Sequence, residues 1–102
     1  MRMVIYRLIV AASTCASVPA LAYTECDVSL QSVFSGDDGY IWLHFTNGGS
    51  AIISPGDVDK QGMTALATSG LMGGRAMTVR YNANSVACNT EGRSDITGLY
   101  LK

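Results

Sequence analysis

The stretch Lys60–Tyr81, KQGMTALATSGLMGGRAMTVRY, limits most strongly what this chain can fold into. Four apolar residues in it recur at i, i+3, i+4 and i+8, a spacing that places them on one stripe of an α-helix. They are Met63, Leu66, Ala67 and Leu71. Glycines that favour a helix end follow at Gly70, Gly73 and Gly74. Since Ala76–Tyr81 then has the composition of a strand, the sequence predicts one amphipathic helix that leads directly into a strand.

Four other segments have the composition of strands and are separated by turn residues. They are Asp27–Phe34, Tyr40–Phe45, Ala51–Ile53 and Ile96–Leu101. In the first, alternation places Val28, Leu30 and Ser32 on one face and Val33 on the other. Three strands, a helix and two strands is the element order of an OB-type barrel, a small five-stranded β-barrel. Because one helix cannot cover both faces of an open five-stranded sheet, we expect a mainly β fold closed into such a barrel.

Residues 1–22 have the pattern of a cleavable signal peptide. Arg2 and Arg7 form a basic start, Leu8–Val18 is an apolar core too short to span a bilayer, and Ala20–Ala22 fits a cleavage site. Cys15 raises the alternative of a lipoprotein signal, which the residues before it disfavour. We therefore predict Sec-type export from a bacterium and a single periplasmic or secreted domain over residues 23–102, with no membrane span.

Charge and cysteine content narrow the class of this domain. After cleavage, five basic residues remain against eight acidic ones, and the net charge of −3 argues against nucleic-acid binding. Cys26 and Cys88 remain as an even pair, which predicts one disulfide in an exported domain of this size. A metal site formed by the two thiolates and His44 is disfavoured, because two cysteines without close spacing and one histidine make a poor ligand set.

The strand Tyr40–Phe45, YIWLHF, carries the candidate binding residues. Ile41, Leu43 and Phe45 form a core face, and Tyr40, Trp42 and His44 form the opposite face. Those rings either pack in a core or subunit interface, or contact a ligand such as a sugar. For a glycan ligand, the chemistry of hydroxyls, carboxylates and rings favours five residues around the preceding turn. They are Ser35, Asp37, Asp38, Tyr40 and Trp42.

No residue pattern predicts catalysis. His44 is the single histidine, there is no Gly-x-Ser-x-Gly elbow, and no carboxylate pair can be placed across a cleft. The glycines at 70–74 follow a helix rather than precede one, so they are not a phosphate cradle. Asp37 and Asp38 lack the alternating ligands that a calcium loop needs. We expect a non-enzymatic protein without cofactor or metal.

The second half of the chain resembles the B subunits of bacterial toxins, most closely the subtilase-cytotoxin and pertussis-like B subunits and their small periplasmic relatives. The resemblance is carried by Ala65–Leu66, Ser69–Gly70, Val79–Tyr81, Cys88 and Ile96–Leu101. It implies an OB fold, a ring of five subunits, recognition of host glycans and an A-subunit-like protein partner. This chain is shorter than those subunits, and no sugar-contacting residue of the family falls on a matching position.

Two functional hypotheses follow from these patterns. The first is an exported, non-catalytic binding module that recognises glycans as a homopentameric ring. The second is a small periplasmic interaction or inhibitor domain that contacts another protein through Tyr40, Trp42 and His44 without binding sugar. The sequence alone barely separates the two hypotheses, because protein interfaces and sugar sites favour the same aromatic residues.

Overall fold

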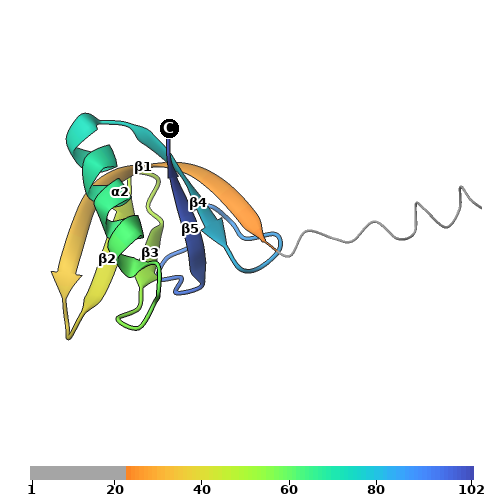
Figure 1. Ribbon diagram of the computed structural model, residues 1–102. Coiled ribbons are helices and arrows are strands. Elements are labelled where there is room, and N and C mark those ends of the chain that lie inside the picture. The colour runs from red at the N-terminus through yellow and green to blue at the C-terminus, as the bar shows by residue number, and fades with distance from the viewer. Residues whose placement is uncertain (1–22) are drawn as a thin grey trace, which may run out of the picture.

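The computed structural model describes residues 23–102, which fold as five strands and one helix (Figure 1). In chain order the elements are β1 (Thr24–Gly36), β2 (Tyr40–Phe45), β3 (Ser50–Ile53), α2 (Lys60–Gly73), β4 (Ala76–Tyr81) and β5 (Ile96–Leu101). The mainly β class and the predicted order of three strands, a helix and two strands are confirmed. The predicted signal peptide, residues 1–22, lies outside the described residues.

The five strands form one antiparallel sheet in the order β3-β2-β1-β4-β5. β1 joins the β3–β2 half of the sheet to the β4–β5 half. Its first part, Thr24–Ser29, pairs with β4, and its second part, Leu30–Gly36, pairs with β2. The register with β2 shifts between Leu30 and Ser32, so that an extra residue is inserted there. Beyond this bulge Val33, not Ser32, pairs with the core residue Leu43, and the strict alternation expected for this strand is wrong at that point.

The closed barrel expected from the sequence is not formed by the strands as described. The ends of the sheet meet only at one isolated parallel bridge, between Ala51 of β3 and Arg93, which precedes β5. The Ile52 N–H donates to the Arg93 carbonyl at 2.7 Å, and the Ser50 N–H donates to the Thr90 carbonyl at 3.0 Å. β3 has four residues, and this segment of the long β4–β5 loop takes the edge that β5 would need for a continuous ladder.

Helix α2 packs on the sheet through the stripe Met63, Ala67 and Gly70, all buried. The expected stripe included Leu66, which is instead 36% exposed, and Leu71, which is only partly buried. The helix approaches β4 closely at Gly70, and this contact sets which side chains face the core. The helix ends at Gly73, with Gly74 in the left-handed conformation (φ 65°) as its C-cap.

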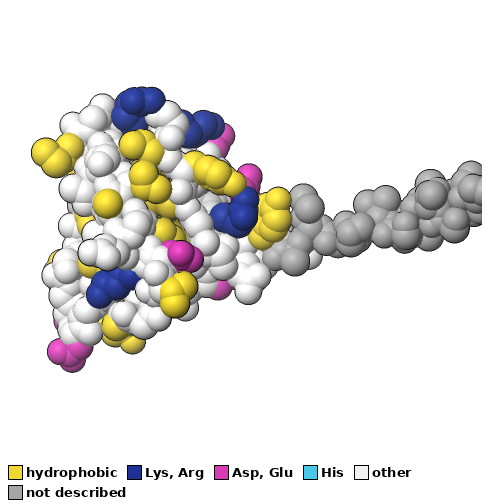
Figure 2. Space-filling model, in the orientation of Figure 1, with side chains coloured by type: hydrophobic (Ala, Val, Ile, Leu, Met, Phe, Trp, Pro, Cys, Tyr) yellow, Lys and Arg dark blue, Asp and Glu magenta, His cyan; other side chains and the backbone are white. Residues whose placement is uncertain are grey.

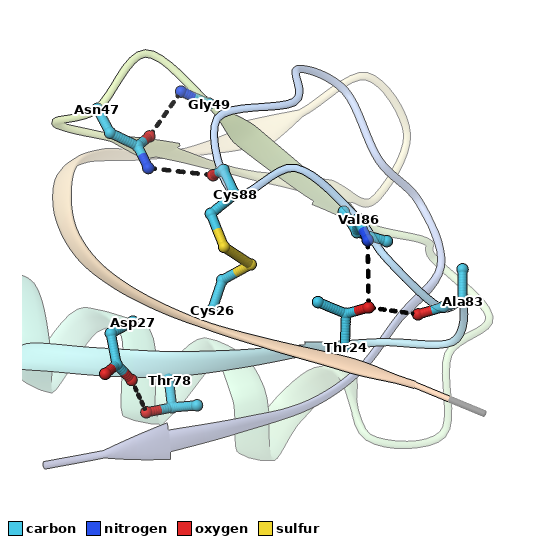
Figure 3. The surroundings of a disulfide bond; sticks show 9 residues. All are labelled: Thr24, Cys26, Asp27, Asn47, Gly49, Thr78, Ala83, Val86 and Cys88. Carbon is cyan, nitrogen blue, oxygen red and sulfur yellow. Dashed lines mark hydrogen bonds between the residues drawn. A yellow bond between two sulfur atoms is a disulfide. The ribbon is translucent and has the colours of Figure 1, made fainter. Parts of the chain in front are cut away.

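The predicted disulfide between Cys26 and Cys88 is present and fastens the β4–β5 loop to β1 (Figure 3). It links residues 62 apart in sequence, with their Cα atoms 5.5 Å apart. The Thr24 hydroxyl donates to the Ala83 carbonyl at 2.7 Å, which holds the start of the same loop. The side-chain amide of Asn47 donates to the Cys88 carbonyl at 3.0 Å. The loop is therefore held by β1 on one side and by the β2–β3 turn on the other.

Candidate functional site

The rings of β2 gather on the outer face of the β1–β2–β3 half of the sheet. Ile41, Leu43 and Phe45 are buried as predicted. Because side chains alternate along a strand and paired residues share a face, Tyr40, Trp42 and His44 point to the opposite side. Phe34 pairs with Trp42 and joins them there. We call Phe34, Tyr40, Trp42 and His44 the aromatic face.

This face is open to solvent. Phe34 is 48% exposed and Tyr40 is 40% exposed, whereas Trp42 and His44 are partly buried. The Phe34 ring folds over Gly36, where a Cβ would lie 2.7 Å from the ring tip. Gly36 therefore leaves the room that allows the ring to lie along the strand. The aromatic face is an exposed surface and not the second half of a core.

Trp42 and His44 form one wall of a hollow at the β3 end of the aromatic face. Their rings are stacked, with centroids 5.9 Å apart and planes 13° from parallel. The hollow, which we call the Trp42 hollow, measures about 460 Å³ and is also lined by Gly48, Ser50, Glu91 and Gly92. This volume lies within the usual range for small-ligand sites. Two rings, a hydroxyl and a carboxylate thus surround one space.

Glu91 reaches the hollow because the β4–β5 loop lies against β3. The Gly92 N–H donates to the Ser50 hydroxyl oxygen at 2.7 Å. Gly49 contacts the loop so closely that a Cβ there would lie 2.9 Å from the Asn89 Cα. Ser50 and Glu91 were not among the binding residues expected from the sequence. The one relevant signal in the sequence was Cys88. The predicted disulfide placed this point of the loop beside β1, but nothing in the sequence indicated that the next residues cross β3.

The five predicted ligand residues do not form one site. Tyr40 and Trp42 share the aromatic face, but only Trp42 lines the hollow. Ser35 pairs with buried Ile41 and faces the other side of the sheet, where it lines a groove beside α2. Asp37 and Asp38 occupy the exposed tip of the β1–β2 hairpin with positive φ angles of 56° and 67°, and neither lines the hollow.

An ion pair anchors the far end of the loop that carries Glu91. The Arg93 guanidinium donates to both carboxylate oxygens of Asp95, at 2.8 and 2.7 Å. These hydrogen bonds lower the pKa of Asp95 below its ordinary value. The Arg93 guanidinium also lies 5.5 Å from the ring centroid of Tyr81. Burial raises the pKa of the Tyr81 hydroxyl to about 12.

A second polar cluster lies on the outer face of β1, β4 and β5. The Arg80 guanidinium sits over the Tyr23 ring at 4.4 Å and near the Tyr100 ring at 5.6 Å. It donates twice to one carboxylate oxygen of Glu25, at 3.0 and 2.9 Å, and these bonds raise the pKa of Arg80. Because its charge is already paired with Glu25, this cluster is a weaker ligand site than the Trp42 hollow.

Comparison with known proteins leaves the family of the chain open. No protein-family model and no curated protein matches it. Within residues 23–102, no three or more histidine, cysteine or acidic side chains are grouped so that they could hold a metal ion. In the same part of the chain, none of the helices has the length and apolar character needed to cross a membrane. The interpretation of the site therefore depends on its own chemistry.

Proposed function

We propose that this protein is an exported, non-catalytic binding module that recognises a glycan in the Trp42 hollow. The observation that carries the proposal is the stacked Trp42–His44 pair beside the Glu91 carboxylate and the Ser50 hydroxyl. Aromatic rings offer an apolar surface to the C–H groups of a sugar ring, while their polar edges bond to its hydroxyls. Glu91 can accept hydrogen bonds from sugar hydroxyls.

The charge of the hollow favours neutral or amino sugars. Glu91 is its single charged lining residue, and neither lysine nor arginine lines it. A sialylated or sulfated glycan would bring a second negative charge beside that carboxylate, and like charges repel. An amino sugar would instead form an ion pair with Glu91. We therefore expect neutral and amino sugars to bind more tightly than acidic ones.

The strand arrangement supports an OB-type barrel for this module. Five strands in the order β3-β2-β1-β4-β5, a helix between β3 and β4, and the parallel bridge Ala51–Arg93 agree with the OB element order. The resemblance to toxin B subunits motivates a ring of five chains and an A-subunit-like partner. In such a ring, weak single-sugar sites would act together on a multivalent surface. The disulfide fits an oxidising compartment such as the periplasm or the exterior.

Trp42 is the only tryptophan of the chain, so its fluorescence reports directly on the hollow. Titration of the oxidised protein with sugars selected on a glycan array should give a saturable change in emission. Glu91→Gln should weaken amino-sugar binding by about tenfold, since a charge-assisted hydrogen bond contributes roughly 1.5 kcal/mol. Asp59→Asn, outside the hollow, is the matched control. No array signal together with a monomeric mass by light scattering would overturn the proposal.

The second candidate function uses the same aromatic face to contact a protein. The exposure of Phe34 and Tyr40 outside the hollow favours it, because large exposed rings are typical of interface hot spots. In that case one host protein should co-purify in equal amount, and free sugars should not displace it. Displacement by a sugar that also changes Trp42 emission would decide for glycan recognition.

A further inference from the structure

A larger groove lies on the opposite side of the β1–β2 hairpin from the aromatic face. It measures about 800 Å³ and runs between α2 and the C-terminal part of β1. Ser35 and Ile41 line it from the sheet, and Thr64, Ala65, Thr68 and Met72 line it from the helix. Figure 1 shows α2 alongside this part of β1. Glycan binding in the Trp42 hollow makes no use of this groove.

The sheet edge beside the groove is unpaired within the described residues. β4 pairs with β1 only as far as Ser29, so Ser32–Gly36 has a strand neighbour on the β2 side alone. The N–H and C=O groups of successive residues point to opposite edges of a strand. The Phe45 N–H donates to the Gly49 carbonyl, and the Phe45 carbonyl accepts from the Gly48 N–H, so both backbone groups of Phe45 point to the β2–β3 turn. The backbone N–H and C=O groups of His44 and Trp42 therefore point toward β1.

This alternation identifies the unpaired groups. His44 and Trp42 pair with Ser32 and Phe34, whose N–H and C=O groups are thus directed at β2. The N–H and C=O groups of Val33 and Ser35 then point to the open edge. Natural proteins usually block such an edge with lysine, proline or a covering segment. Gln31–Gly36, QSVFSG, contains neither lysine nor proline.

The helix wall of the groove has the chemistry to cover an added strand. None of its residues from Gln61 to Met72 is charged, and charges occur only at one end, at Asp57 and Lys60. In Figure 2, the surface over α2 is mostly white and yellow, and dark blue Lys or Arg side chains lie near the two ends of the helix. The Thr64 hydroxyl is buried and has no hydrogen-bond partner among the described residues.

The dimensions of the groove also fit a strand. The helix from Gln61 to Met72 spans roughly 17 Å at a rise of about 1.5 Å per residue. A strand of about five residues has the same length. The unpaired edge Ser32–Gly36 is of that size as well. The groove is therefore long enough to hold a strand of about five residues.

We propose that this groove binds an extended segment of a partner protein, which adds to the free edge of β1 as a further strand. Hydrogen bonds with Val33 and Ser35 provide affinity independent of sequence. The uncharged walls select a segment without charged side chains along its centre, because a buried unpaired charge is strongly unfavourable. Alternate side chains of the segment point to the face of the sheet that α2 covers.

The test screens a displayed library of random heptapeptides against the oxidised protein. We expect enriched peptides to be uncharged in their central residues and to bind Ser35→Ala as they bind the wild type. Ser35→Pro should bind at least tenfold more weakly, because proline removes the N–H that faces the open edge. Proline is tolerated on the open side of an edge strand, so this variant should fold. Its circular dichroism and Trp42 emission check that expectation.

A second measurement keeps the proposal testable if Ser35→Pro does not fold. The best peptide is synthesised in two forms, each with one of the two alternating sets of backbone nitrogens methylated, so that each form is blocked from strand pairing at one edge without a change in its side chains. Loss of binding by one of the two forms supports the added strand. No enrichment, or equal binding of both methylated forms and the unmethylated peptide, overturns it. A concentration-dependent dimer that Ser35→Pro abolishes would also overturn it, since the occupant would then be a second copy of the chain.

Discussion

Gly70 of α2 lies directly against Met77 of β4, so that a Cβ on Gly70 would be 2.7 Å from the Met77 sulfur. The same Cβ would lie 3.2 Å from a methyl carbon of Leu101. Met77 is fully buried. The absence of a side chain at Gly70 therefore allows the close approach of α2 to β4 and β5.

Two glycines of the same helix should respond to alanine in opposite directions. Gly70→Ala should lower the free energy of unfolding by about 1–3 kcal/mol, because it overpacks a filled core. Gly62→Ala should raise it by about 0.5–1 kcal/mol, since Gly62 is exposed, has nothing within 4 Å of an added Cβ, and alanine favours the helix. Urea denaturation measures both. Stabilisation by both substitutions would contradict the close packing at Met77.

The disulfide should contribute a large part of the stability of so small a domain. Replacing both Cys26 and Cys88 with alanine opens a loop of 62 residues, and we expect a loss of about 4 kcal/mol in unfolding free energy. Guanidinium denaturation of the oxidised protein, the reduced protein and the double variant measures this loss. Reduced wild type and the variant should agree. A difference below about 1 kcal/mol from the oxidised protein would show that the loop contacts alone hold residues 82–95.

Local signals in the sequence explain why the element order and the disulfide could be predicted. Alternating residues in Tyr40–Phe45 and turn glycines report on their own neighbourhoods, and the two cysteines that follow the predicted signal peptide leave a single pairing. The rotation of α2 could not be predicted in the same way. Leu66 fits the apolar stripe by spacing, but it is the contact between Gly70 and Met77 that turns the helix, and the two residues lie on different elements.

The candidate site was predicted only in part for the same physical reason. Trp42 could be predicted because side chains alternate along a strand, which places it on the face opposite to Ile41 and Leu43. Ser35 was expected in the hairpin turn after a strand ending at Phe34, whereas β1 extends to Gly36 and pairs Ser35 with buried Ile41. Glu91 was missed because the loop reaches β3 through backbone hydrogen bonds, which leave no pattern in side-chain identity.

The ion pair between Arg93 and Asp95 predicts a pH-dependent contribution to stability. The folded-state pKa of Asp95 lies below the ordinary value of 3.8, so its contribution is present above that value and is lost as pH falls through the folded pKa. Asp95→Asn should therefore destabilise the protein by about 0.5–1 kcal/mol at pH 7. The gap to wild type should close below about pH 4. A gap that is constant down to pH 2 would contradict the ion pair.

The hairpin tip should affect stability but not ligand binding. Asp37 and Asp38 both have positive φ angles, a conformation that glycine adopts at lower cost than any side-chain-bearing residue. Asp38→Gly should therefore raise the unfolding free energy by about 0.5 kcal/mol. Because neither carboxylate lines the Trp42 hollow, Asp38→Gly and Asp37→Asn should bind sugars with wild-type affinity in the Trp42 emission titration. A tenfold loss of sugar affinity in either variant would contradict binding in the Trp42 hollow and would favour the hairpin turn expected from the sequence.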